Sequence, residues 1–358
     1  MSRPKYFSKM NTNKSISNFR FPAEWEKHEA TWIAWPHNKS DWPEKFTTIK
    51  WVYAEIVKAI LPGEKVRIII QSEKQKSEAI SVLKSAHTFS EQVEFIKLKT
   101  DRGWLRDISP IYVENVKTKK LEQVSFRFNA WAKYNNYKKD VKFPKFVSNK
   151  LKIKNTDVIR NSRKVVLEGG SIETNGKGIL LTTKECLLDE KVQIRNKGFT
   201  QKDYEEIFSN YLGIKKVIWL NRGIAGDDTH GHVDDICRFV NKNTVVAVDE
   251  NKPRDENYKL LKENLEILNT EKNINVVKLP MPKPVYFKNL RLPASYANFL
   301  IANSSVIVPT FNDENDRKAL NILSALFPNR EIIGIHAVDL VWGLGTIHCL
   351  TKEQPEFK

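Results

Sequence analysis

The chain has 358 residues, a formal net charge of +16, 41% hydrophobic and 28% charged residues. This composition is typical of a globular protein with a sizeable core. No stretch approaches the roughly 20 consecutive apolar residues that a membrane span requires, so we expect no membrane segment. The lysines are spread along the whole chain and are not interleaved with aromatic residues, which favours a solvated basic surface over a nucleic-acid site.

The first residues differ in character from the rest of the chain. Residues 1–18 are polar and basic and lack the apolar run of a secretory signal, so we expect a mobile lead-in. No Pro-, Ser- or Gly-rich linker follows, and residues 19–358 are predicted to form a single catalytic domain. Cys186, Cys237 and Cys349 are scattered without a Cys-x-x-Cys pair. This spacing predicts no disulfide framework and favours a reducing, cytoplasmic location.

Several segments share one order of elements: a short apolar run, a turn, an amphipathic helix and a second apolar run. Their spacing of about 60–80 residues predicts an internally repeated α/β architecture rather than a solenoid. The expected units are 31–35, 44–61 and 66–70; 179–182, 201–212 and 217–220; 245–248, 256–268 and 274–278; 306–309, 314–327 and 331–335; and a weaker one from 111 through 140–151 to 158.

Cys349 is a candidate nucleophile, since a cysteine in an intracellular chain with histidine and acidic residues elsewhere has the parts for nucleophilic catalysis. The alternative is an inert buried cysteine. Upstream, Asp107 lies in the run 104–107 (WLRD), where its carboxylate could accept two hydrogen bonds from a planar cation. Trp104 could then form a wall of the pocket by stacking on that cation, whereas a structural Arg–Asp ion pair is the competing interpretation.

Glu168 ends the apolar run Val165–Leu167, which we expect to be a strand, and two glycines follow it. Glycines there allow a close backbone approach, so Glu168 could hold and charge a histidine. A plain turn with an exposed glutamate is the alternative.

Residues 226–235 (GDDTHGHVDD) form the densest polar cluster. A solvated acidic loop is one interpretation. The spacing of His230, His232 and Asp234 also resembles the metal motif of metallo-β-lactamase-type hydrolases, although few further histidines are present to complete it. A third interpretation places His232 and Asp234 on a strand, where residues two apart face the same side. A general acid/base and a cation-binding carboxylate would then point into one pocket.

The chain resembles the agmatine deiminase family of guanidine-modifying enzymes, which is similar to the bacterial peptidylarginine deiminases. The matching motifs run in order across nearly the whole chain: 22–32 (PAEWEKHEATW), 35–36 (WP), 104–110 (WLRDISP), 128–131 (FNAW), 167–172 (LEGGSI), 231–235 (GHVDD), 293–298 (PASYAN) and 345–349 (GTIHC).

The resemblance implies a pentein fold, a five-bladed α/β propeller with pseudo-fivefold units and a central site. It also implies Cys349 as nucleophile, His232 as general acid/base, Asp107 and Asp234 as guanidinium-binding catalytic carboxylates, and Glu168 as the partner of His232. The resemblance also makes Asn298 and Trp104 candidate substrate-binding residues. Asn298 matches a polar position near the site, and Trp104 stands in a matched motif. No metal and no organic cofactor are implied.

Three departures from the family pattern lie near the expected pocket. Ala132 and Lys133 stand where the family usually has two glycines, His230 stands where it often has Asp, and Leu344 interrupts a glycine run. These differences bear on substrate identity more than on reaction class.

The reaction implied is hydrolysis of a guanidino group through a covalent thiouronium on cysteine, and the partner is a small cationic guanidino substrate. Agmatine is preferred, giving N-carbamoylputrescine and ammonia, because nothing clearly supplies a clamp for an α-carboxylate; Arg127 and Arg222 are the candidates. Free arginine and peptidyl-arginine remain alternatives on the same site. From other classes, a metal-dependent hydrolase and a non-catalytic polyanion-binding protein stay open. The oligomeric state is left open too, a homo-oligomer included.

Overall fold

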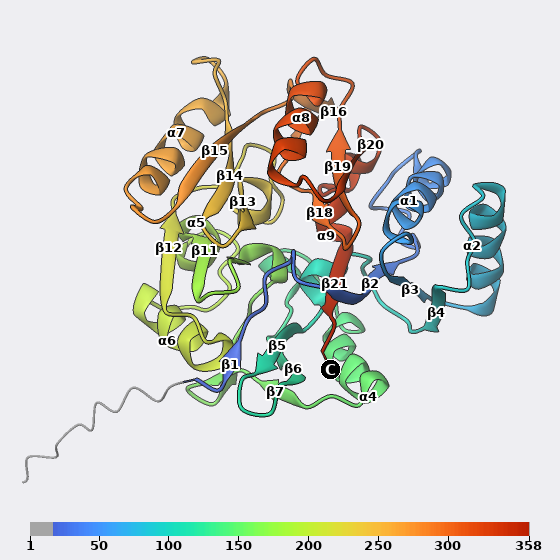
Figure 1. Cartoon of the computed structure of the whole chain (residues 1–358), viewed down its shortest axis with the longest axis horizontal. Helices are drawn as coiled ribbons and strands as arrows, with labels where there is room; N and C mark the ends of the chain where they lie inside the picture. Colours follow the sequence, from blue (N-terminus) through green and yellow to red (C-terminus); the bar gives the residue numbers. More distant parts are fainter. Residues whose placement is uncertain (1–16, 358) are drawn as a thin grey trace, which may run out of the picture.

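The computed structural model describes residues 17–357 (Figure 1). The predicted mobile lead-in, residues 1–18, lies outside the described residues except for Ser17 and Asn18. The first strand, β1 (Phe19–Arg20), begins directly after them and pairs with β5 (Ile111–Asn115).

Five sheets are arranged around a common centre, so the predicted five-bladed α/β propeller is confirmed (Figure 1). In each sheet an inner strand pairs antiparallel with the next strand, and the strands after it run parallel and are joined through a helix. The second sheet has β1 as an additional strand, antiparallel to the inner strand β5. Parallel neighbours need such a crossover, which explains the strand–helix–strand pattern in the sequence.

The bounds of the blades follow. The first contains β21 (Thr351–Pro355), β2 (His28–Ala34), α1 (Phe46–Ile60), β3 (Lys65–Ile70), α2 (Glu73–Ser85) and β4 (Val93–Lys97). The second contains β1, β5, β6 (Lys120–Ser125), α4 (Phe143–Leu151) and β7 (Asn155–Asp157). The third contains β10 (Glu173–Thr174), β11 (Ile179–Thr183), α5 (Lys184–Leu188), α6 (Gln201–Leu212) and β12 (Lys216–Leu220).

The fourth blade contains β13 (Cys237–Asn241), β14 (Thr244–Asp249), α7 (Glu256–Asn269) and β15 (Asn275–Pro280). The fifth contains β18 (Leu300–Ile301), β19 (Ser305–Thr310), α8 (Asp316–Leu326) and β20 (Glu331–His336). Two hairpins project from the ring, β8 (Ile159–Arg160) with β9 (Arg163–Lys164), and β16 (Val285–Phe287) with β17 (Leu290–Leu292). Short helices α3 (Leu105–Ile108) and α9 (Ile347–Leu350) lie at the centre.

Four of the five expected units match the observed elements to within a few residues. The weaker unit was wrong at its start. The strand at Ile111 is the inner antiparallel strand β5, and the parallel pair joined by α4 is β6 with β7. The short β7, with three half-buried residues, carries little of the apolar signal that marks the other closing strands.

The helices pack against the sheets through one apolar face. In α1 the buried residues include Ile49, Tyr53, Ile56 and Ile60, at the spacing of one helical face. At the end of this helix, a Cβ on Gly63 would lie 2.8 Å from the backbone nitrogen of Ser304. Glycine there lets the first and fifth blades approach closely.

Candidate active site

The predicted site residues occupy equivalent positions in the five blades. Each comes shortly before the inner strand of its own blade. They are Asp107 before β5, Glu168 before β10, Asp234 before β13, Asn298 before β18 and Cys349 before β21. Because the inner strands surround one axis, segments that precede them meet at the centre of the ring (Figure 1).

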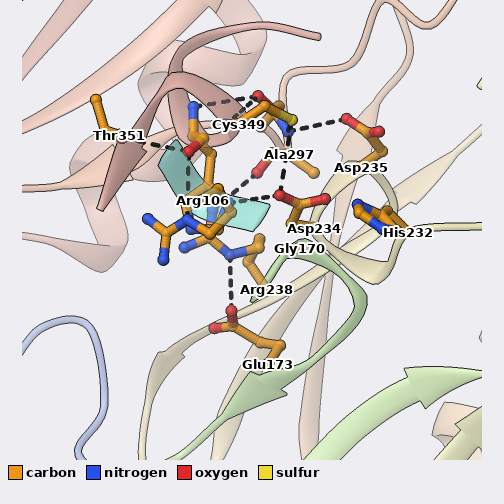
Figure 2. Close-up of polar contacts among 12 residues, drawn as sticks. Arg106, Gly170, Glu173, His232, Asp234, Asp235, Arg238, Ala297, Cys349 and Thr351 are labelled. Atoms are coloured by element: carbon orange, nitrogen blue, oxygen red, sulfur yellow. Dashed lines mark hydrogen bonds and ion pairs between the residues drawn. The ribbon is translucent and has the colours of Figure 1, made fainter. Parts of the chain in front are cut away.

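Gly170 marks the point where three of the predicted side chains converge. A Cβ on this glycine would lie 2.5 Å from His232 Nδ1 and 3.0 Å from both Asp107 Oδ1 and Asp234 Oδ2. Figure 2 shows His232, Asp234 and Gly170 grouped beside Cys349. Any side chain at position 170 would therefore fill the space between the imidazole and the two carboxylates.

The Cys349 thiol lies against carboxylates and a single amide donor. Its Sγ is 3.8 Å from Asp234 Oδ2, and Asn298 Nδ2 donates to it at 3.1 Å. Burial, together with the charges of Asp234, Asp235 and Asp107, raises the pKa of Cys349 well above its ordinary value. The residue is 5% exposed. These surroundings favour the neutral thiol over the thiolate.

Asp107 is held from two sides. Its Oδ1 accepts from the backbone N–H of Gly170 at 3.0 Å, and its Oδ2 accepts from Trp131 Nε1 at 2.8 Å. Burial raises the pKa of Asp107, and the negative charges of Asp234 and Glu168 add to this, whereas His232 opposes it. The carboxylate is thus oriented by two donors, and the imidazole of His232 lies 3.9 Å from its Oδ1.

His232 does not lie on a strand, so the expectation of strand alternation was wrong. The residue precedes a 3₁₀ turn, Val233–Asp235, and β13 begins only at Cys237. A turn orients the side chains here because Asp227 Oδ2 accepts the backbone N–H groups of Gly231 and His232 at 2.7 and 3.1 Å. The two predicted residues nevertheless reach the same pocket, as their distances to Gly170 show.

The imidazole of His232 lies between carboxylates. Its Nδ1 is 3.9 Å from Asp107 Oδ1, and its Nε2 is 3.8 Å from Glu168 Oε2. Burial alone would lower the pKa of His232, but the Asp107 charge and the proximity of Cys186 and Glu168 raise it well above its ordinary value. The ring therefore carries a proton that it can give to a leaving group.

Glu168 is fully buried and paired with a cation that the sequence analysis missed. Arg195 Nε donates to Glu168 Oε1 at 3.1 Å, and Arg195 Nη2 donates to the carbonyl of Thr229 at 2.6 Å. Burial would raise the pKa of Glu168, but the charge of Arg195 lowers it below its usual range. The expected strand at Val165–Leu167 is only an isolated bridge between Arg127 and Val166, so it was wrong.

Asp234 has a second buried partner on its other side. His348 Nδ1 is 2.6 Å from Asp234 Oδ2, and His348 Nε2 is 2.7 Å from Glu24 Oε2. Each ring nitrogen of His348 therefore faces a carboxylate oxygen. Burial would raise the pKa of Asp234, but the hydrogen bond and charge of His348 lower it. Arg238, which pairs with Glu24 and with Glu173 at 2.8 and 3.0 Å, continues this buried network (Figure 2).

Trp104 and Asn298 both lie at the site. A Cβ on Gly345 would lie 2.9 Å from Trp104 Cζ3 and 3.3 Å from Cys349 Sγ, which places the indole beside the sulfur. The Asn298 side chain is engaged by the protein: its Oδ1 accepts from Thr346 Oγ1 at 2.7 Å, and its amide donates to Asp235 Oδ1 at 3.0 Å as well as to the thiol. These contacts give Asn298 a part in orienting Cys349.

His230 is separated from the cluster that its spacing suggested. Its Nε2 is 2.9 Å from Asp189 Oδ2, and the residue has the positive φ of 63°. Within residues 17–357, the groups of three or more potential metal ligands are Glu168 with Cys186 and His232, and Asp234 with Asp235 and Cys349. Neither group contains His230, so the proposed His230/His232/Asp234 metal set is not assembled.

The sequence analysis also missed several partners of the predicted residues. They are Arg195, Cys186, Asp235, Glu24 as the partner of His348, and Trp131 as the donor to Asp107. Trp131, Glu24, His348 and Asp235 stand inside matched motifs, so the motifs held a signal for them. Nothing in the local pattern around Cys186 or Arg195 pointed to the site.

Comparisons with known proteins agree with this geometry. Among the described residues, no helix has both the length and the apolar character needed to cross a membrane. The structure is similar to a substituted agmatine deiminase of C. jejuni with substrate bound, at 31% identity and a TM-score of 0.85 over 95% of this chain and 97% of that one. It is similar to the agmatine deiminase of Enterococcus faecalis at 28% identity and a TM-score of 0.85, over 95% and 96% of the two chains.

A more distant structure shares the fold alone. SxtG, an amidinotransferase from Microseira wollei, is 11% identical with a TM-score of 0.53 over 95% of this chain and 99% of that one. The family model described as Porphyromonas-type peptidyl-arginine deiminase matches residues 20–355. The chain therefore belongs to the Porphyromonas-type peptidyl-arginine deiminase family.

Proposed function

We propose that this protein is an agmatine deiminase that converts agmatine and water into N-carbamoylputrescine and ammonia. The observation that carries the proposal is the convergence at Gly170 of His232, Asp107 and Asp234, with the Cys349 sulfur 3.8 Å from Asp234. This arrangement surrounds a small space with carboxylates and places a thiol at its edge. Names of similar proteins support the same reaction, since two solved relatives are agmatine deiminases.

The two carboxylates would bind the guanidinium, and the bound cation would ionise the thiol. At ~4 Å and an effective dielectric of about 20, one like charge costs about 4 kcal/mol, or roughly three pKa units before screening. Asp234 and Asp107 therefore oppose thiolate formation in the empty site. A guanidinium that binds between them neutralises this effect, so the thiol of Cys349 releases its proton to solvent and substrate itself promotes formation of the thiolate.

The chemistry then proceeds in two halves. The thiolate of Cys349 attacks the guanidino carbon, and the tetrahedral adduct expels ammonia after His232 protonates the leaving nitrogen. A thiouronium on the sulfur remains, and neutral His232 now removes a proton from water. The hydroxide adds to the same carbon, the carbon–sulfur bond breaks, and the ureido product leaves. Glu168 would hold the imidazole throughout.

The charges around the site support agmatine over free arginine. A clamp for an α-carboxylate needs a cation without a partner, and the central arginines Arg106, Arg195 and Arg238 are each buried and paired with glutamates. Arg127 and Arg222 are exposed. We propose further that the protein acts in the cytoplasm as a single catalytic domain spanning 19–358 and binds no nucleic acid.

The direct test is ammonia release from agmatine, arginine and an arginyl peptide. We expect agmatine to be the best substrate, and the Cys349→Ser variant to lose at least about 10³-fold in kcat, because the residues of such a site act as a unit. Cys237→Ser, which changes a buried cysteine of β13 that belongs to neither group of converging ligand atoms, is the matched control and should stay active. Turnover of agmatine by Cys349→Ser at the native rate would refute the mechanism.

A further inference from the structure

A second group of ligating atoms lies behind the catalytic imidazole. One atom each from Glu168, Cys186 and His232 lies within 4.8 Å of the others, and all three residues are buried. Neither ring nitrogen of His232 has a hydrogen-bond partner among the described residues. Nδ1 faces Asp107, at 3.9 Å, and Nε2 faces Glu168, at 3.8 Å. The Nε2 atom of His232 is thus available as a metal ligand, and it lies on the side of the ring opposite the carboxylate Asp107.

The third blade places Cys186 next to Nε2 of His232. It lies in the short helix α5, directly after β11, and its backbone N–H donates to Thr183 Oγ1 at 3.1 Å. The thiol is not used by the deiminase mechanism. Thr183 Oγ1 donates in turn to the carbonyl of Gly231, next to His232, so the cysteine and the histidine are tied through one hydroxyl.

Sulfur, imidazole nitrogen and carboxylate oxygen form a donor set that suits zinc. Bond lengths of about 2.0–2.2 Å place the nitrogen and oxygen ligands of a tetrahedral zinc roughly 3.3–3.6 Å apart. The 3.8 Å between His232 Nε2 and Glu168 Oε2 would have to shorten by a few tenths of an ångström, and the three ligand atoms lie within 4.8 Å of one another. Three protein ligands leave a fourth position for water.

We propose that Glu168, Cys186 and His232 form a binding site for a thiophilic divalent cation such as Zn²⁺, and that its occupation inhibits the enzyme. The binding itself is independent of the reaction, whereas the inhibition rests on the proposed function. A metal on Nε2 would keep the imidazole from carrying a proton between the leaving group and water. The cation would sit behind the ring, so the guanidinium could still bind.

Arg195 competes with a cation for this site, because its Nε donates to Glu168 Oε1 at 3.1 Å and to Glu168 Oε2 at 3.3 Å. A bound cation would share the carboxylate with this guanidinium. The second group of potential ligands, Asp234, Asp235 and Cys349, contains the proposed nucleophile and a proposed guanidinium-binding carboxylate, so a cation there would compete with substrate.

Cobalt(II) titration of the full chain tests the site without any assay of catalysis. We expect a thiolate-to-cobalt charge-transfer band in wild type and in Cys349→Ser, with one equivalent displaced by Zn²⁺. Cys186→Ser should lose this band, while Cys237→Ser should keep it. A band that disappears with Cys349→Ser but persists in Cys186→Ser, or the absence of any band in the folded wild type, would overturn the proposal.

A second measurement covers the case in which Cys186→Ser fails to fold. X-ray absorption at the zinc edge of loaded Cys349→Ser should show one sulfur at about 2.3 Å together with nitrogen and oxygen ligands. A shell of nitrogen and oxygen alone would overturn the proposal.

Kinetics then test the inhibitory part. Zn²⁺ should lower kcat for agmatine at least tenfold with little change in KM, and a chelator should restore it. Competitive inhibition would instead place the metal in the guanidinium pocket. If agmatine is not a substrate at all, the proposed function fails but the cobalt spectra still decide whether the site exists.

Discussion

His348 lies between two buried carboxylates and determines the charge of one that would bind substrate. Its two ring nitrogens contact Asp234 and Glu24 at 2.6 and 2.7 Å, and both contacts are buried. Burial would raise the pKa of Asp234, but the hydrogen bond and charge of His348 lower it. We therefore propose that His348 is a positioning residue that acts through Asp234.

We predict that His348→Gln raises the pKa of Asp234, because the variant removes the positive charge that lowers it. A protonated Asp234 cannot pair with a guanidinium, so KM for agmatine should rise by about 10–100-fold near neutral pH, corresponding to the roughly 1.5–3 kcal/mol of a charged hydrogen bond. The defect should be largest at low pH and shrink as pH rises. A pH profile of KM measures this shift.

His28→Gln provides the matched control. His28 is equally buried and pairs with Glu64 at 3.1 Å, but it has no contact with Asp234. This variant should lose stability without moving the pH profile. Identical profiles for the two variants would show that His348 serves the fold alone.

At the scale of elements, the turn 130–132, which donates a hydrogen bond to Asp107, is left-handed and contains no glycine. Ala130, Trp131 and Ala132 have φ of 53°, 57° and 53°, and the turn aims the Trp131 indole at Asp107. An L-residue in this region costs roughly 1–2 kcal/mol. The departure from the family at Ala132 therefore introduces strain beside the site.

We predict that Ala132→Gly stabilises the protein by about 1 kcal/mol, since glycine adopts positive φ without the steric cost, less its greater loss of chain entropy. Urea unfolding measures the change. Ala86→Gly at the end of α2, where φ is −84°, should stabilise nothing or weaken the fold. An equal gain in both variants would contradict the explanation by strain.

The elements show which parts of the molecule can be read from the sequence. Helices such as α1 and paired strands such as β14 and β15 were predictable, because burial of a face leaves a periodic apolar pattern. The turns that carry Asp234 and Glu168 were not predictable. Asp227 accepts the backbone N–H groups of Gly231 and His232, Asp107 accepts that of Gly170, and such contacts leave no periodic pattern in the sequence. The Cys186 contact depends on how the blades converge, which local sequence does not specify.

At the scale of the whole molecule, the buried carboxylate of Glu24 connects residues from several blades. Its Oε2 contacts Arg238 at 2.8 Å, His348 at 2.7 Å and Arg106 at 3.5 Å, while Oε1 accepts the backbone N–H of Ile301 at 2.8 Å. Burial would raise the pKa of Glu24, but these cations, Arg238 foremost, lower it well below the usual range. The contribution to stability is thus present above the unfolded pKa and lost as pH falls through the folded value.

Glu24→Gln should destabilise the fold by about 3–5 kcal/mol at neutral pH, because it leaves buried cations without their counter-charge. Urea unfolding at pH 7 measures this. Glu26→Gln on the same segment is the control: Glu26 pairs with Arg20 but its side chain is 33% exposed, so the cost should be within about 1 kcal/mol. Equal effects would show that Glu24 is not the centre of the network.

The ring is closed by pairing β21 with β2, so the strand that follows Cys349 completes the blade that the chain begins with. Trp32 Nε1 donates to Gln354 Oε1 at 3.0 Å across this seam. On a ribosome, the first four inner-strand segments are made long before residue 349 emerges. The proposed nucleophile Cys349 therefore joins the other site residues only when the last strand of the chain docks on the early strand β2.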